Sequence, residues 1–163
     1  SQGSYYSNLG EACRAAGQLD AAQRWLAEAI KRQPNVAAPY LNMALVHAAR
    51  GDQHAAAERC RDALRRNPQY AAAHTLLGKA QFALGQHPEI LDVRTVDALG
   101  QHAAARDSFA RAMACNPNSY EALTNLADAL IAEKKLDDAE ALMGRALTAQ
   151  PASADVQLRL GDL

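Results

Sequence analysis

The feature that most constrains the fold of this chain is a repeat with a period of 34 residues. A proline that follows a polar residue closes each unit, at Pro34, Pro68, Pro117 and Pro151. These prolines are 34, 49 and 34 residues apart, so the middle interval is 15 residues longer than the period that the others share. A fixed period of this length is typical of arrays in which each unit packs only on its neighbours.

Small and bulky apolar residues keep the same period. Within each unit the apolar residues recur every three to four positions, as in amphipathic helices. Gly17 and Gly51 divide their units into two helices, and the prolines separate consecutive units. Small columns let two antiparallel helices approach closely, and bulky columns fill the space between one helix pair and the next. The small columns are Ala22, Ala56, Ala105, Ala139; Ala29, Ala63, Ala112, Ala146; and Gly10, Ala44, Gly78, Ala127, Gly161, and the bulky columns are Leu26, Cys60, Phe109, Met143; and Leu9, Met43, Leu77, Leu126, Leu160.

Composition narrows the classes of function. The chain has 163 residues, 49% of them hydrophobic, which suffices for one domain, and its formal net charge of -1 gives no general attraction to nucleic acid or anionic membranes. No apolar run approaches the roughly 18–20 residues that span a bilayer. Three widely spaced cysteines and five histidines without metal-ligand spacing favour a reducing, cytoplasmic location. We expect no cofactor, no metal, no nucleic-acid or membrane partner and no enzymatic activity.

The residues that share the period resemble a known family. The pattern NLG–C–G–L–A–L–A–P in residues 8–34 looks like the 34-residue tetratricopeptide repeat, a helix–turn–helix unit. The resemblance implies an all-α, right-handed solenoid of antiparallel helix pairs, with nine helices apart from the insertion. We expect a single array over 1–163, and because it begins at Ser1 and stops within a unit, we expect a piece of a longer, bacterial protein. The expected units are 3–36, 37–70, 71–119 with 15 extra residues, 120–153 and a partial fifth at 154–163.

The departures from the family pattern are modest. His74 and Leu123 replace the aromatic residue that Tyr6 and Tyr40 supply, and Lys134 replaces the glycine of the turn.

The resemblance also implies a function. Tetratricopeptide arrays bind peptides or proteins in a concave groove that the first helix of each unit lines, so we expect an interaction scaffold that binds a partner peptide or protein. The alternative is a substrate-recognition arm of a larger enzyme such as a glycosyltransferase. The apolar middle of the groove suits aliphatic anchors, and its acidic far end favours a basic ligand segment. The groove residues expected from this mapping are Asn8, Asn42, Asn125, Leu41, Leu45, Thr75, Lys79, Phe82, Glu121 and Asp128.

Asparagine recurs at one position of this groove. Asn8, Asn42 and Asn125 occupy equivalent places, and Leu76 interrupts the row. An asparagine amide offers donors and an acceptor, so such a row can hold the main chain of an extended peptide. The row is similar to the asparagine ladder in the repeat region of O-linked N-acetylglucosamine transferases. The alternative is that each asparagine satisfies local backbone groups.

The family's two-carboxylate clamp for chaperone carboxy termini is not matched. Only Asn42 fits its pattern of Lys, Asn, Asn, Lys and Arg, because Ser7, Glu11, Ala72 and Leu76 occupy the other places. A chaperone carboxy terminus is therefore not the expected ligand.

The 15 extra residues lie near 86–100, between two copies of ALGQH at 83–87 and 98–102. The first copy is expected to finish one helix and the second to open the next, with Gly85 or Gly100 as the turn glycine. Pro88 permits a short extra helix, whereas the β-branched run ILDVRTV favours an extended segment. The insertion is expected to be a passive loop, a contact for a homodimer, or an occupant of the chain's own groove. Its candidate contact residues are Pro88, Ile90, Leu91, Val93, Val96 and Leu99.

Overall fold

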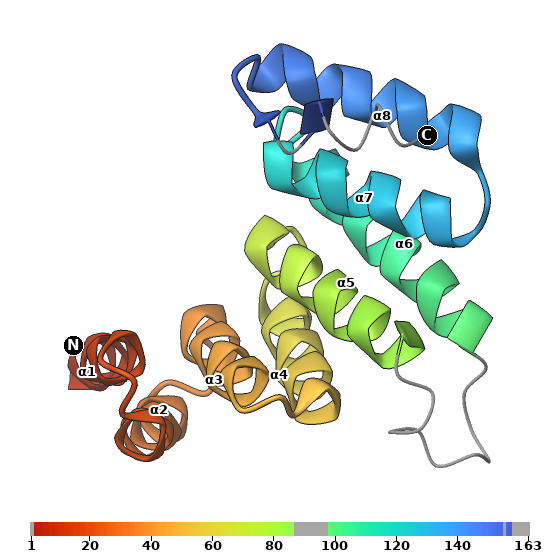
Figure 1. Ribbon diagram of the computed structural model, residues 1–163. Coiled ribbons are helices and arrows are strands. Elements are labelled where there is room, and N and C mark those ends of the chain that lie inside the picture. The colour runs from red at the N-terminus through yellow and green to blue at the C-terminus, as the bar shows by residue number, and fades with distance from the viewer. Residues whose placement is uncertain (1, 87–97, 155, 158–163) are drawn as a thin grey trace.

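The fold consists of helices packed in consecutive pairs (Figure 1). A computed structural model describes residues 2–86, 98–154 and 156–157, and within these residues it contains eight helices and no strand. Turns of three residues join the helices of the first, second and fourth pairs, so their helices are antiparallel. The helices are α1 (Gln2–Ala15), α2 (Leu19–Arg32), α3 (Ala37–Ala49), α4 (Gln53–Arg66), α5 (Ala71–Gln86), α6 (Ala98–Cys115), α7 (Tyr120–Ala132) and α8 (Leu136–Ala149).

The predicted all-α solenoid is confirmed. Each helix contacts the next one along the chain, and each of the four expected units contains one helix pair. Of the ninth expected helix, Ala154, Val156 and Gln157 are helical and Val156 is fully buried, while most of this helix lies outside the described residues.

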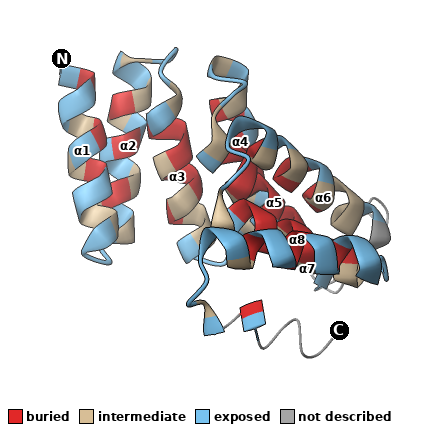
Figure 2. Cartoon of the chain, turned by 90° about the horizontal axis from the view of Figure 1, so that it is seen from above, coloured by how far each residue is buried: buried red, intermediate tan, exposed pale blue. Residues whose placement is uncertain are grey.

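The periodic columns form the core. All eight alanines of the two alanine columns are at most 1% exposed, and the bulky column from Leu26 to Met143 is at most 2% exposed. Figure 2 shows these buried faces turned toward neighbouring helices, while the outward faces are exposed. Small residues therefore set the close approach within a pair, as the sequence pattern predicts.

Two glycines in the third small column lie against large side chains of the facing helix. A Cβ atom on Gly78 would lie 2.5 Å from the ring of Phe109, and one on Gly10 would lie 2.6 Å from Leu26 Cγ. Ala44 and Ala127 hold the same place in the second and fourth units, where the bulky column carries Cys60 and Met143. Glycine thus stands where the facing side chain already fills the space of a methyl group.

The turns within helix pairs use left-handed backbone. Gly17 has a φ of 74°, Gly51 a φ of 80°, and Lys134, at the equivalent position of the fourth unit, a φ of 62°. Lys134 therefore takes the conformation of the glycine that it replaces, which strains a residue with a Cβ atom.

Replacing Lys134 with glycine is expected to raise the free energy of unfolding by about 0.5–1 kcal/mol. The left-handed conformation costs a non-glycine residue about 1–2 kcal/mol, and the greater freedom of glycine in the unfolded chain offsets part of this gain. Urea unfolding measures the change. Lys134→Ala is the control, because it removes the charge but keeps the strain; equal stabilisation by both variants would contradict the backbone explanation.

The third unit differs from the expected one at its turn. The first ALGQH copy ends α5 at Gln86 and the second opens α6 at Ala98, as expected. Neither Gly85 nor Gly100 is a turn glycine, however, because both lie inside helices that continue past the usual boundary. Just inside these added ends, the rings of Phe82 on α5 and His102 on α6 lie 5.1 Å apart, so the two helices remain in contact there.

The segment between these helices lies outside the described residues. This applies to the candidate contacts Pro88, Ile90, Leu91, Val93 and Val96 and to the side chain of Leu99. Its expected roles therefore stay predictions.

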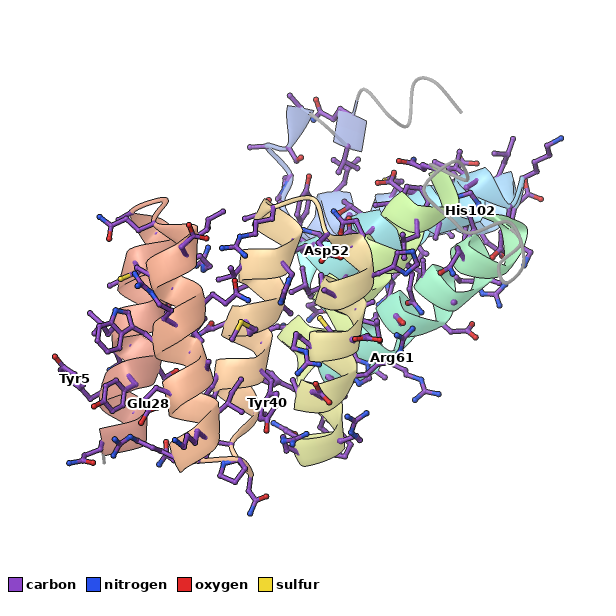
Figure 3. All side chains as sticks on the ribbon, turned by 90° about the horizontal axis from the view of Figure 1, so that it is seen from below. Tyr5, Glu28, Tyr40, Asp52, Arg61 and His102 are labelled. Carbon is purple, nitrogen blue, oxygen red and sulfur yellow. The ribbon has the colours of Figure 1, made fainter. Side chains whose placement is uncertain are left out.

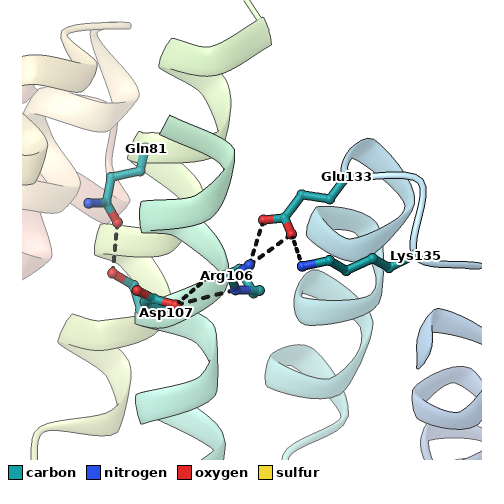
Figure 4. A network of polar contacts seen from close by, with 6 residues as sticks. Gln81, Arg106, Asp107, Glu133 and Lys135 are labelled. Atoms are coloured by element: carbon teal, nitrogen blue, oxygen red, sulfur yellow. Dashed lines mark hydrogen bonds and ion pairs between the residues drawn. The ribbon is translucent and has the colours of Figure 1, made fainter. Parts of the chain in front are cut away.

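A polar network joins the third unit to the fourth (Figure 4). Arg106 on α6 donates to both carboxylate oxygens of Glu133, at 3.1 and 2.8 Å, and Lys135 donates to the same carboxylate at 2.6 Å. The Glu133 side chain is only 8% exposed. Burial alone would raise the pKa of this carboxyl, but the hydrogen bonds and charges of Lys135 and Arg106 outweigh burial and lower the pKa below its ordinary value.

Acid is expected to weaken this network. Because folding lowers the pKa of Glu133, the stability that it adds is present above its ordinary pKa of 4.5 and is lost as pH falls through the lowered pKa. Glu133→Gln should cost about 1 kcal/mol at neutral pH and progressively less below about pH 4.5. Urea unfolding at several pH values measures this, with Glu140→Gln on the exposed face of α8 as the control. A constant difference across pH would contradict the prediction.

Candidate functional site

The odd-numbered helices form one continuous layer of the array. Among α1, α3, α5 and α7, each helix contacts the next of this set, while the even-numbered helices make no comparable contacts with one another in the described residues. The odd-numbered helices are the first helices of their units, so this inner layer carries the positions predicted for the groove.

A depression of about 190 Å³ opens on the inner layer between α3, α5 and α7. Five of its seven lining residues are predicted groove residues, and Ala72 and Leu76 on α5 complete it. Leu76 stands at the asparagine position, where the sequence shows only an interruption of the row. The lining residues are Leu41, Leu45, Ala72, Thr75, Leu76, Lys79 and Glu121.

The depression is apolar at its base. Leu41 is 7% exposed, and Leu45 and Leu76 are half-buried. The hydroxyl of Thr75 donates to the carbonyl of Ala71 at 3.1 Å, so it is already satisfied within its own helix. Aliphatic groups of a ligand would find apolar contacts here.

An ion pair between Lys79 on α5 and Glu121 on α7 closes one side of the depression. The two side chains are 47% and 58% exposed, so water solvates both charges. Exposed pairs of this kind contribute about 0–1 kcal/mol, so a charged ligand group can replace either partner at little cost.

The three predicted asparagines lie on three helices of the inner layer. Asn8 on α1 is exposed, and Asn42 on α3 and Asn125 on α7 are half-buried. The Nδ2 atom of Asn125 is buried without a hydrogen-bond partner, and among the described residues we find no hydrogen bond from the side chains of Asn8 and Asn42. The described contacts thus include no local backbone group that these amides satisfy.

Phe82 and Asp128, the remaining predicted groove residues, do not line the depression. Phe82 packs beside His102 and against the core of the C-terminal half, so it stabilises the lengthened α5–α6 pair. Asp128 is half-buried on α7.

Neither a cluster of metal ligands nor a membrane-spanning helix accompanies the groove in the part of the chain that the structure describes. It contains no group of three metal-ligating side chains, and none of its helices is long and apolar enough to cross a membrane. Cys60, in a packing column, is fully buried, and burial raises the pKa of its thiol to about 12. This cysteine therefore packs the core rather than acting as a nucleophile.

The stacked pairs and the groove on their inner layer define a helical-repeat solenoid. Three family models of the tetratricopeptide repeat match the chain, at residues 3–28, 41–89 and 98–163. The chain belongs to the tetratricopeptide repeat family. A comparison with curated proteins found no match.

Solved structures of low sequence identity share this fold. A fragment of MamA from Desulfovibrio magneticus RS-1 has a TM-score of 0.82 at 20% identity, covering 99% of this chain and 83% of that one. PilF from Pseudomonas aeruginosa has a TM-score of 0.79 at 19% identity, covering 98% and 66%. The first TPR of Spaghetti (RPAP3), bound to the HSP90 peptide SRMEEVD, has a TM-score of 0.70 at 20% identity, covering 81% and 93%.

Proposed function

We propose that this chain is an interaction scaffold that binds an extended segment of a partner protein along its inner layer. The observation that carries the proposal is the depression between α3, α5 and α7, where leucines from two helices form an apolar base. Its volume of about 190 Å³ is below the roughly 300–1,000 Å³ of sites for drug-sized ligands. It suits one aliphatic side chain of a longer ligand rather than a small metabolite.

Besides the apolar depression, the asparagine row offers hydrogen bonds for the main chain of the ligand. Asn42 follows Leu41 on α3, so its amide belongs to the same helix as two of the residues that line the pocket. Asn8 and Asn125 extend the row along the inner layer, and the amide of Asn125 lacks a partner within the described residues. Amides that bind the main chain of a ligand hold it whatever its sequence, while the apolar pocket selects one residue type.

The charge of the groove favours a basic segment. Glu121 and Asp128 both lie on α7, at the C-terminal side of the depression. A lysine or arginine of the ligand can pair with Glu121 in place of Lys79, because that exposed pair is weak.

The remaining features of the function are finer proposals. The thiols of Cys13, Cys60 and Cys115 are free, which agrees with a reducing, cytoplasmic compartment. A homodimer through the insertion rests on residues outside the described part of the chain.

Asn42→Ala and Asn125→Ala are each expected to weaken binding by about 1 kcal/mol, the value of a lost hydrogen bond, without lowering thermal stability. The ligand is a peptide selected from a random library for binding to the whole protein. Titration calorimetry measures the affinity of each variant for this peptide. Asn35→Ala, at an exposed position between α2 and α3, is the control. Leu45→Asp should abolish binding, since it places a charge in the apolar pocket.

Two outcomes would contradict the proposal. One is unchanged affinity in the Leu45→Asp variant, which would place the site away from the depression. The other is a loss of stability without a loss of affinity in both asparagine variants, which would make these residues structural.

A further inference from the structure

A furrow runs along the outer face of the array between α4 and α6. It exists because the even-numbered helices do not pack on one another, so α5 forms its floor. Its volume is about 450 Å³, and a second depression of about 430 Å³ at the α4–α5 loop shares His74 and Arg111 with it. The two together form one elongated site on the layer opposite the inner groove.

The rim of this furrow is basic. Arg61 and Arg65 project from α4, one helical turn apart, and Arg111 projects from α6 on the other side. Figure 3 labels Arg61 on the α4 side. Among the described residues, Arg61 and Arg111 form no ion pair, although both are exposed. Two arginines facing each other across a furrow are suited to hold carboxylates between them.

Nearby carboxylates do not cancel this charge. Asp62 already pairs with Arg59 at 2.8 Å and with Arg65. Asp107, on the α6 wall, pairs with Arg106 at 3.0 Å. Among the residues that line the furrow, the three arginines Arg61, Arg65 and Arg111 face one carboxylate, Asp107, so the lining carries two excess positive charges on a chain whose net charge is -1. The furrow therefore has the opposite sign to the acidic end of the inner groove.

The floor contains a buried ring nitrogen that lacks a partner. His74 is 6% exposed, and its Nε2 bonds the carbonyl of Pro68 at 2.9 Å, which fixes the proton on Nε2. Its Nδ1 is buried and has no hydrogen-bond partner. Beside it, the buried side chains of Gln81 and Ser108 share a hydrogen bond of 2.7 Å. A buried acceptor without a partner in the chain can accept a hydrogen bond from a water molecule or from an N–H group of a ligand.

The second unit fills the space that is open here and, with about 470 Å³, at the equivalent place of the fourth unit. At the equivalent place in the second unit, the guanidinium of Arg66 lies 3.8 Å from the ring centre of Tyr40 and donates to the carbonyl of Pro34 at 2.7 Å. In the third unit Cys115 replaces the arginine and His74 replaces the tyrosine. The shorter side chains leave the volume that the stacked pair fills in the second unit.

We propose that this outer furrow binds an acidic, extended segment of a partner protein. Carboxylates of the segment pair with Arg61 and Arg111 across the furrow, and a main-chain or side-chain N–H donates to His74 Nδ1. Charge complementarity identifies the ligand, and the elongated shape with leucines on its walls favours a peptide over a small anion.

Fluorescein-labelled hexaglutamate is the probe, with hexaglutamine as the neutral comparison, and fluorescence anisotropy reports its binding to the whole protein. We expect hexaglutamate to bind more weakly as salt concentration rises and hexaglutamine not to bind. Arg61→Glu and Arg111→Glu should each weaken hexaglutamate binding at least about tenfold. Arg24→Glu, on the exposed face of α2, makes the same change of net charge elsewhere and should have little effect by comparison.

His74→Phe tests the contribution of the furrow floor, because it keeps a ring of similar size and removes Nδ1. This substitution should also weaken hexaglutamate binding. Circular dichroism verifies that each variant keeps its helices, and Leu45→Asp should leave hexaglutamate binding intact, so this test is independent of the inner groove. If Arg24→Glu weakened hexaglutamate binding as much as the furrow variants do, the proposal would be overturned. Displacement of the probe by phosphate at the same concentration of charge would also overturn it, because that result would indicate a site for small anions.

Discussion

Replacing Phe109 with alanine is expected to lower the free energy of unfolding by about 3–5 kcal/mol. Phe109 is 2% exposed and belongs to the core of the C-terminal half. Its ring occupies the gap between α5 and α6 at Gly78, where its carbons are the heavy atoms nearest to a Cβ atom added to the glycine. Removal of the ring therefore leaves a cavity, because the glycine opposite cannot fill it. Guanidinium unfolding with a helical signal measures the loss.

Phe82→Ala is the matched control for this prediction. Phe82 is half-buried at the end of the same helix pair, so its removal exposes its neighbours to water rather than leaving a closed cavity. Its cost should be clearly smaller. Equal losses in the two variants would show that the helix pair, and not the gap at Gly78, determines the energetics.

Gly78→Ala is expected to destabilise the protein by about 1–3 kcal/mol, although alanine is the better helix former. The added methyl group would lie 2.5 Å from the Phe109 ring, so the ring or the helices must shift. In a Phe109→Met background the same substitution should be neutral or stabilising, because the fourth unit already combines Ala127 with Met143. A double-mutant cycle measures this coupling. Additive effects of the two substitutions would contradict the steric explanation.

The period in the sequence predicts the helices and their packing because burial repeats with it. Each small and bulky column supplies one side of a contact with the next helix, so spacing alone identifies the core. Lys134 is predicted to stand at a turn although it is not glycine, since its place in the period outweighs its residue type. The structure gives it the left-handed backbone of that turn.

The period does not predict the turn of the third unit. Gly85 and Gly100 both align with a turn glycine, but the helices continue through them. Leu84, just before Gly85, is 3% exposed in the lengthened pair. A glycine permits left-handed backbone without requiring it, so packing decides which conformation it adopts.

The two candidate sites differ in how far sequence predicts them. The inner depression follows from helix register, so the pattern places most of its lining residues on the groove face, including Leu76, which interrupts the asparagine row. The outer furrow depends on side-chain length at His74 and Cys115, which lie far apart in sequence. The repeat pattern alone does not show that His74 and Cys115 lie close together in the folded chain.

The continuity of the inner layer, together with the gaps in the outer one, gives the array a preferred way to bend. We expect small shifts at the inner contacts to widen or narrow the outer gaps, as in the motions of packed helices in other proteins. A segment wedged between α4 and α6 holds one such gap at a fixed width, and with it the spacing of α3, α5 and α7. By thermodynamic linkage, a ligand on the inner layer then changes the affinity of the outer furrow by the same factor in return. The curvature of the array would in this way couple two binding sites on opposite faces that share no contact.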